Sequence, residues 1–284
     1  MSARARSHRA TAADAPSSRP RLPLLRKALA DSWRSTLGWS AGLAAVMLVY
    51  LPLYPAIGAN AEVQGMLDAL PQELVKALNY GEVASGPGYT QATFFGLFGY
   101  LLMSIAAIGW GASAVGGDED DGLLELTLAH GTTRTRVVLE RAAALVVRVA
   151  VLAAVTLSLL LVLREPAQLG VDPANALAAE TMLVLLVLLP GTAALLAGSV
   201  GGRRVHGTAA GSVVAVLAYA LNALGNQNPD LEWLHPFSPY HWAFGQSPLV
   251  NGIDAPAALG LAALSAALVA LSAVALNRRD VGAH

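Results

Sequence analysis

The sequence predicts an all-α, polytopic membrane protein with six transmembrane helices, an N-terminal interfacial helix and a short cytoplasmic helix. Three observations carry this prediction. The first two are that 55% of the 284 residues are hydrophobic and that only 13% are charged, whereas a soluble domain has about 25% charged residues. The third is the distribution of the apolar residues, which gather in long runs. A membrane span needs about 20 of them, because a helix rises about 1.5 Å per residue across about 30 Å of hydrocarbon.

Six runs meet this requirement, and backbone groups in lipid must pair within their own segment, so each run is expected to be a helix. The period-two alternation of a membrane β-barrel is absent. The predicted spans are Leu37–Ile57, Ala92–Val115, Ala142–Leu163, Leu177–Val200, Thr208–Gly225 and Pro256–Leu276.

Composition also excludes several functions. The formal net charge of -1 argues against a nucleic-acid-binding protein, which would show a basic excess. The high hydrophobicity excludes a disordered chain. There is no cysteine, so disulfides, thiolate metal sites and cysteine nucleophiles are excluded together.

The distribution of basic residues predicts the orientation. If the N-terminus is inside, 15 of the 18 Lys and Arg residues fall in inside segments and only Lys76 and Arg164 fall outside. The positive-inside rule therefore places both termini in the cytoplasm. Residues 1–23, rich in Arg, Ser, Ala and Pro, are predicted to be a disordered cytoplasmic tail, and residues 24–284 to form the transmembrane domain.

The segment Leu24–Thr36 comes before the first span. Its apolar residues, among them Trp33, recur at helical spacing with charged residues between them. This pattern favours an amphipathic helix in the cytoplasmic membrane interface. The alternative is a plain extension of the first span into water.

Two outer loops are long. Gly58–Gln91 has apolar residues with a period of three or four, and its possible roles are a lid, an interfacial helix or a partner surface. Asn226–Ala255 is dense in aromatic residues and prolines. Such density beside a span indicates a segment at or dipping into the outer membrane interface, with the aromatics as anchors.

The loop between spans two and three is the most informative. Four acidic residues, Asp118–Asp121, open it, and a short leucine-rich helix follows. Gly131 is suited to close that helix and Thr132 or Thr133 to cap the next. The acids do not have the spacing of an EF-hand loop, so we interpret them as a solvated charge run at a helix N-terminus. The alternative is ion pairing with a partner protein or with Arg134, Arg136 or Arg141.

This loop resembles the cytoplasmic loop of type-2 ABC exporter permeases, in which acids, a Gly, a Leu-Glu-Leu-x-Leu helix and a later Arg follow the second span. Two positions depart from that pattern: Leu123, where the family often has Thr, and Gly131, where it often has Pro. The final outer loop from Ser238 to Gly252 and the ending Asn277-Arg278-Arg279-Asp280 are also similar. The matching positions in the loop are Glu119, Gly122, Leu124, Glu125, Leu126, Leu128, Ala129 and Arg134.

The resemblance implies a function for this loop. It identifies roughly Asp118–Leu128 as a coupling helix that docks on a cytoplasmic P-loop ATPase, which would bind ATP and Mg²⁺. It also implies a second permease subunit, identical or similar, a place in the plasma membrane, and export of an amphipathic drug, natural product, lipid or peptide. The residues expected to couple to the ATPase are Asp118, Glu119, Gly122, Leu124, Glu125, Leu126, Leu128 and Arg134.

The residues themselves offer no chemistry for energy conversion. The chain has no G-x-x-x-x-G-K-[ST] loop, and its only lysines are Lys27 and Lys76, so it is not expected to bind ATP in the P-loop manner. No H-E-x-x-H motif is present. Two alternatives stay open: an ion-driven secondary transporter, which would need intramembrane acids, and a membrane-embedded enzyme, which lacks a catalytic constellation.

Charged residues within the predicted spans are few. Arg148 is the clear case, and a charge at such depth is by default a functional candidate. Two interpretations of Arg148 are open. In the first its side chain snorkels to the interface or forms a structural ion pair, and in the second it contacts the substrate or a gate. Glu180 is a weaker candidate. Three glycine pairs permit close helix approach: Gly38 with Gly42, Gly198 with Gly202, and Gly207 with Gly211.

Overall fold

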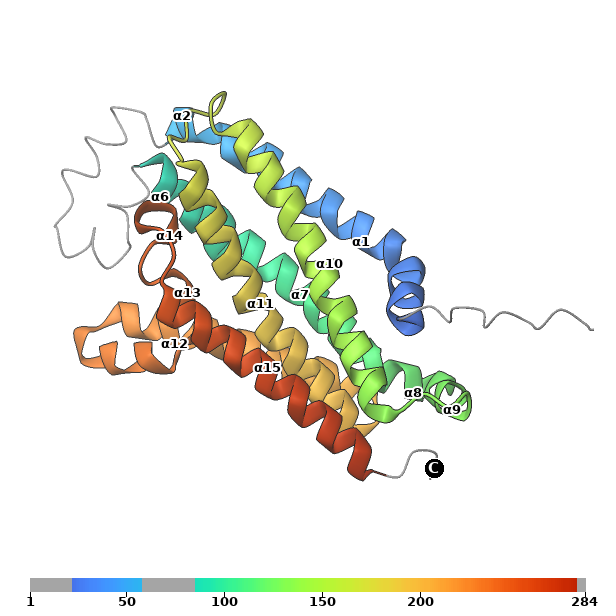
Figure 1. Ribbon diagram of the computed structural model, residues 1–284. Coiled ribbons are helices and arrows are strands. Elements are labelled where there is room, and N and C mark those ends of the chain that lie inside the picture. Colours follow the sequence, from blue (N-terminus) through green and yellow to red (C-terminus); the bar gives the residue numbers. More distant parts are fainter. Residues whose placement is uncertain (1–21, 58–84, 280–284) are drawn as a thin grey trace, which may run out of the picture.

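The computed structural model describes residues 22–57 and 85–279. The predicted tail, apart from its last two residues, and most of the predicted Gly58–Gln91 loop lie outside the described residues. Within them the chain is helical and has no strand, and six helical segments are long and apolar enough to cross a membrane. The predicted all-α fold with six spans is therefore confirmed (Figure 1).

The first span is one helix with the segment that precedes it. Helix α1 runs from Pro23 to Tyr50 and is followed by a 3₁₀ turn, Leu51–Leu53, and a short helix α2, Tyr54–Ile57. No break separates the expected interfacial helix from the span. The first turns of α1 nevertheless bend away from the rest of the helix (Figure 1), and Ser32 Oγ donates to the carbonyl of Ala28 there, a back-bond that often bends helices.

The second span changes its helical pitch twice. It begins with α6 (Gly86–Thr90), widens into a π-helix at Gln91–Gly99, continues as α7 (Tyr100–Ala112), widens again at Ser113–Gly117 and ends with α8, Asp118–Asp120. Such π segments are frequent at functional sites and are not signalled by apolar periodicity.

The other four spans follow the predicted runs: three begin a turn or more earlier, and every other end lies within two residues of the prediction. They are α10 (Arg134–Leu163), α11 (Pro173–Gly201), α12 (Arg204–Gln227) and α15 (Ala255–Arg278). Three begin at side chains that accept hydrogen bonds from N–H groups of the first turn, as favoured caps do. These are Thr133, Asp172 and Asp254.

Helix α11 forms the centre of the bundle. It packs against α7, α10, α12 and α15, and its most apolar 18 residues are 72% buried, the largest share of the six spans. Helix α1 lies along α10 at one edge (Figure 1). Large apolar residues exposed on the outer helices, such as Val162 and Leu259, are expected to face lipid.

The loop before α15 folds back onto the end of the bundle that the sequence predicts to be the outer one, as η4 (Pro229–Phe237), α13 (Pro239–Phe244) and α14 (Pro248–Asn251). Its aromatics divide into two groups. Trp233 and Phe237 are exposed, as membrane anchors would be, whereas Tyr240 is buried. The hydroxyl of Tyr240 donates to the carbonyl of Gly96 at 2.7 Å, so this residue belongs to the core.

Candidate functional site

A left-handed glycine redirects the chain between the second span and the short helix that follows. Gly122 has φ of 69°, which favours glycine. Helix α9 then runs from Leu123 to Ala129. It ends at a second left-handed glycine, Gly131, and Thr133 accepts from the N–H of Arg136 to cap α10. The predicted short helix, its stop at Gly131 and the cap at Thr133 are confirmed.

Helix α9 has two faces. The side chain of Leu124 is fully buried in an apolar cluster with Val115, Val138 and Leu276, and Leu128 packs partly against it. On the other face, Leu123 and Leu126 are 43% and 60% exposed, and Glu125 is exposed beside them. The outer face is therefore available to a partner, while Leu124 anchors the helix to the bundle.

Three consecutive acids before the turn bind three different parts of the bundle. Asp118 forms an ion pair with Arg141 of α10, and Glu119 forms one with Arg279 just after α15. Asp120 accepts a hydrogen bond of 2.8 Å from the backbone N–H of Arg204 at the start of α12. The prediction of a solvated run is thus wrong for three of the four acids, because each has a basic or N–H partner from another part of the bundle, whereas Asp121 is exposed.

Arg134 completes this connection. Its guanidinium donates to the carbonyl of Leu276 at 2.9 Å and also to that of Arg279. These are carbonyls at the C-terminal end of α15, where a cation is favoured by the helix dipole. The segment from Asp118 to Arg134 is therefore tied to the ends of α10, α12 and α15.

Of the three arginines considered as partners for the acids, only Arg141 takes that role. Arg134 binds carbonyls, and Arg136 pairs with Glu140, its Nε lying 2.7 Å from Glu140 Oε1. Among the described residues, no group of three His, Cys, Asp or Glu side chains is placed to hold a metal ion.

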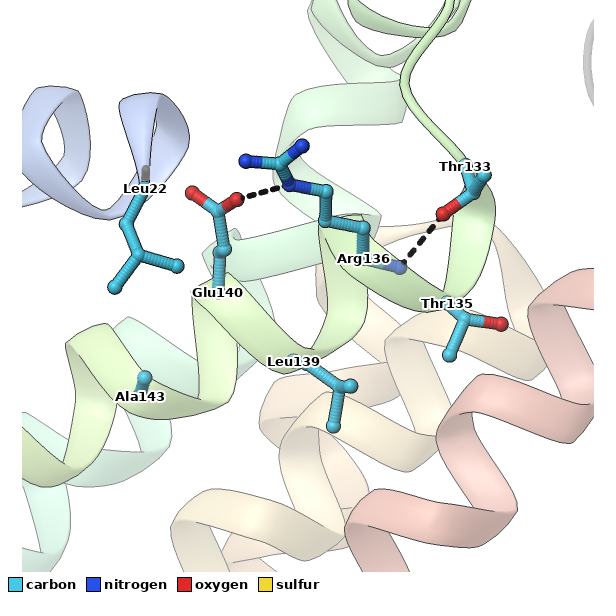
Figure 2. A pocket seen from close by; sticks show the side chains of 7 residues that line it. All are labelled: Leu22, Thr133, Thr135, Arg136, Leu139, Glu140 and Ala143. Carbon is cyan, nitrogen blue, oxygen red and sulfur yellow. Dashed lines mark hydrogen bonds and ion pairs between the residues drawn. The ribbon is translucent and has the colours of Figure 1, made fainter. Parts of the chain in front are cut away.

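Glu140 is a connecting residue that the sequence did not indicate. Its buried carboxylate accepts from the N–H groups of Leu24 and Leu25, at 2.8 and 2.9 Å, in the first turn of α1. Figure 2 shows Glu140 between Leu22 and Arg136 in a shallow pocket. Because Pro23 opens the helix without a side-chain cap of its own, Glu140 supplies the missing acceptor from a neighbouring helix.

Arg148 joins three helices. Its Nη2 donates to the carbonyl of Ala28 on α1 at 2.6 Å, and its guanidinium lies over the ring of Trp110 on α7, 5.6 Å from the centroid. Trp110 in turn donates to Ser35 of α1. Among the described residues Arg148 has no carboxylate within ion-pair distance, so the structural ion pair is not formed and the side chain uses a carbonyl and an aromatic face instead.

Arg148 also lines a pocket at this end of the bundle. The pocket has a volume of about 1000 Å³ and lies between the N-terminal part of α1, the C-terminal part of α7, α9 and α10. Helix α9 is therefore one wall of a cavity.

Glu180 lies elsewhere, within α11. It is buried and accepts a hydrogen bond of 2.9 Å from Thr156 of α10, and its Oε2 has no partner among the described residues. The pair fixes α10 against α11 away from the acid cluster.

A stacked histidine pair at the opposite end was also missed. The rings of His235 and His241 are parallel, with centroids 4.0 Å apart. One ring nitrogen of His235 lies at hydrogen-bond distance from the side-chain oxygen of Asn226. One ring nitrogen of His241 lies at hydrogen-bond distance from the side-chain oxygen of Asn222. Burial, and then the neighbouring His235, lower the pKa of His241, which favours the neutral ring.

Comparisons with known proteins agree with the arrangement of the spans. A protein-family model described as ABC-2 family transporter protein matches residues 22–281. The match starts one residue before α1 and extends past the end of α15, so it covers all six spans. A comparison with curated proteins gave no match.

Proposed function

The chain belongs to the ABC-2 family of transporter proteins and is a membrane subunit of an ABC transporter, and we propose that it exports an amphipathic substrate using a separate ATPase. Membrane subunits of this family are generally non-catalytic. We place binding of ATP and Mg²⁺ in the partner chain, a choice supported by the absence of a P-loop motif from the sequence.

The proposal rests mainly on the two faces of α9. Leu123, Glu125 and Leu126 are exposed on α9, and Leu123 and Leu126 also line the cavity beside it. Asp118, Glu119, Asp120 and Arg134 tie the same segment to three helices. A partner pressing on α9 would move a segment whose connections are charge-assisted hydrogen bonds, which are short and directional. We therefore assign α9 the role of coupling helix, with its exposed residues as the contact and the acids as the transmission.

Export, rather than import, is supported by the cavity beside α9. The positive-inside rule puts this end of the bundle in the cytoplasm, so a substrate entering the cavity would come from the inner leaflet or the cytosol. ATP-driven closure of the ATPase would then shift the bundle between arrangements of different substrate affinity. A second copy of the chain, or a similar one, would complete the pathway in the plasma membrane.

Co-purification and transport test this assignment together. Leu126→Asp is expected to abolish co-purification with the ATPase and to abolish ATP-dependent export, because it places an uncompensated charge in an apolar contact. Val205→Asp is the matched control: Val205 is also apolar and exposed, in the first turn of α12, where an acid suits the helix dipole.

The variants distinguish docking from folding. Both proteins are expected to elute as single species with unchanged helical content. Retention of ATPase binding and export by Leu126→Asp would refute the coupling role of α9. Equal loss in both variants would assign the effect to general surface charge.

A further inference from the structure

The cavity beside α9 has an unbalanced set of charges. Its lining includes four basic residues, Lys27, Arg141, Arg148 and Arg204, and two acidic ones, Asp31 and Asp118. Arg141 is paired with Asp118. Among the described residues, neither Lys27 nor Arg148 lies within ion-pair distance of a carboxylate, so two cations at this site keep their capacity for an anion.

Arg148 also keeps unused hydrogen-bond donors. Its one hydrogen bond to the described residues is from Nη2 to the carbonyl of Ala28, and its Nε is buried without a partner. A guanidinium has five N–H donors, and unpaired donors away from water are costly. An oxyanion in the cavity would accept hydrogen bonds from Nη donors that Ala28 does not use, because Arg binds phosphate and carboxylate through several N–H groups at once.

The rest of the lining combines small polar residues with an apolar and aromatic part. Trp39, Ile105 and Trp110 form the wall toward the spans, with Trp110 held in place by Ser35. The cavity volume of about 1000 Å³ is at the upper end of the range for small-molecule sites. A charged head and a hydrophobic body would thus each find a matching surface.

We propose that this cavity binds an anionic amphipathic molecule. Its acidic head group lies on Arg148 and Lys27, and its apolar part lies along Trp39, Ile105 and Trp110. Two sources share this chemistry: a resident acidic phospholipid of the adjoining leaflet, or the exported cargo. The assignment of the ligand as exported cargo rests on the proposed function, whereas binding of an anionic amphipathic molecule does not. Because α9 forms the opposite wall, movement of the coupling helix would change the shape of the site.

The binding test uses the full chain purified in a neutral detergent. Titration with phosphatidylglycerol carrying brominated acyl chains is expected to quench tryptophan fluorescence, and brominated phosphatidylcholine to quench it at concentrations at least about tenfold higher. Trp110→Phe is expected to reduce the quenching.

Three variants locate the head group. Lys27→Gln combined with Arg148→Gln is expected to weaken phosphatidylglycerol binding about tenfold or more, since two charge-assisted contacts are lost. Arg148→Lys keeps the charge, so this variant should bind phosphatidylglycerol more tightly than Arg148→Gln does. If the double variant fails to fold, the comparison of these two single variants tests the site instead. The control, Arg34→Gln with Arg278→Gln, removes two basic residues outside the cavity and should bind as the unaltered chain does.

Equal affinity for the two lipids, or equal weakening in the control and the double variant, would overturn the proposal. Transport in vesicles with the ATPase then identifies the source. ATP-dependent movement of labelled phosphatidylglycerol between leaflets supports the cargo reading. Binding of phosphatidylglycerol without its movement between leaflets supports the resident lipid. In that case the binding site stands even if the export proposal fails.

Discussion

The carboxylate of Glu140, on α10, accepts the backbone N–H of Leu24 at 2.8 Å and so caps a helix 116 residues earlier in the chain. This contact, together with the one from Leu25, fixes the start of α1 beside the segment that leads from α9 into α10. A movement of the proposed coupling helix α9 would therefore reach α1 through this contact.

Removing this acceptor should loosen the start of α1. Glu140→Ala removes the acceptor of two backbone N–H groups and the carboxylate that pairs with Arg136 Nε, and we expect a loss of about 1–3 kcal/mol in the free energy of unfolding. Glu140→Gln should lose less, because its amide oxygen still accepts. Chemical unfolding in detergent measures the change. Glu125→Ala, at an exposed acid on α9, is the control, and equal values for the two alanine variants would contradict the capping role.

The ion pair between Glu119 and Arg279 should be needed for coupling. Glu119→Arg places two cations together and is expected to abolish substrate-stimulated ATPase activity in the assembled transporter while leaving the basal activity of the ATPase. Combining it with Arg279→Glu restores an opposite pair, so at least a partial recovery is expected. Failure of the double variant to exceed the single one would show that the residues act independently.

The sequence predicted the parts of this site whose signals are local. Apolar runs located the spans, and Gly131 and Thr133 marked where α9 ends and α10 begins, because glycine stops and threonine caps act within a few residues. The inward direction of Leu124 was not predictable, since its neighbours come from α10, α11 and α15. Nor was the partner of Glu119, which lies 160 residues away.

The same limit applies to Arg148 and Glu140. Charge at depth identified Arg148 as a candidate, but its actual partners, a carbonyl of α1 and a ring of α7, depend on how three helices pack. Glu140 carries no motif at all. It stands near the predicted cytoplasmic end of a span, where an acid is ordinary, and only the arrival of α1 gives it a function.

The histidine pair should make the outer end of the bundle sensitive to acid. The pKa of His241 is lowered from the usual 6.5, so below that pH the unfolded chain binds more protons than the folded one. The free energy of unfolding therefore falls as the pH drops through 6.5 towards the folded pKa.

Thermal unfolding measures this effect. When the pH is lowered from 7.5 to 5, the midpoint of thermal unfolding should fall more for the unaltered chain than for His241→Gln. His130→Gln, at an exposed histidine on the other end, should follow the unaltered chain, and parallel curves for all three would exclude His241.

Two of the predicted glycine pairs differ in what surrounds them. A Cβ at Gly207 would lie 2.7 Å from the carbonyl oxygen of Ala194, and one at Gly211 would lie 2.8 Å from that of Pro190, so α12 and α11 approach there as the sequence predicts. At Gly38 and Gly42 a Cβ would meet nothing within 4 Å among the described residues. Of these two pairs, Gly207 with Gly211 provides close approach within the described part of the chain, and Gly38 with Gly42 does not.

Alanine substitutions should separate these two situations. Gly207→Ala and Gly211→Ala are each expected to destabilise the chain by about 1–3 kcal/mol, because backbone must move to admit the methyl group. Gly42→Ala has open space and should stabilise it by up to about 1 kcal/mol through helix propensity. Unfolding of the chain as a monomer in detergent measures both. A destabilised Gly42→Ala monomer would contradict the open surface on α1. If instead Gly42→Ala is stable as a monomer but impairs self-association, the same glycine packs against a second subunit rather than within its own chain.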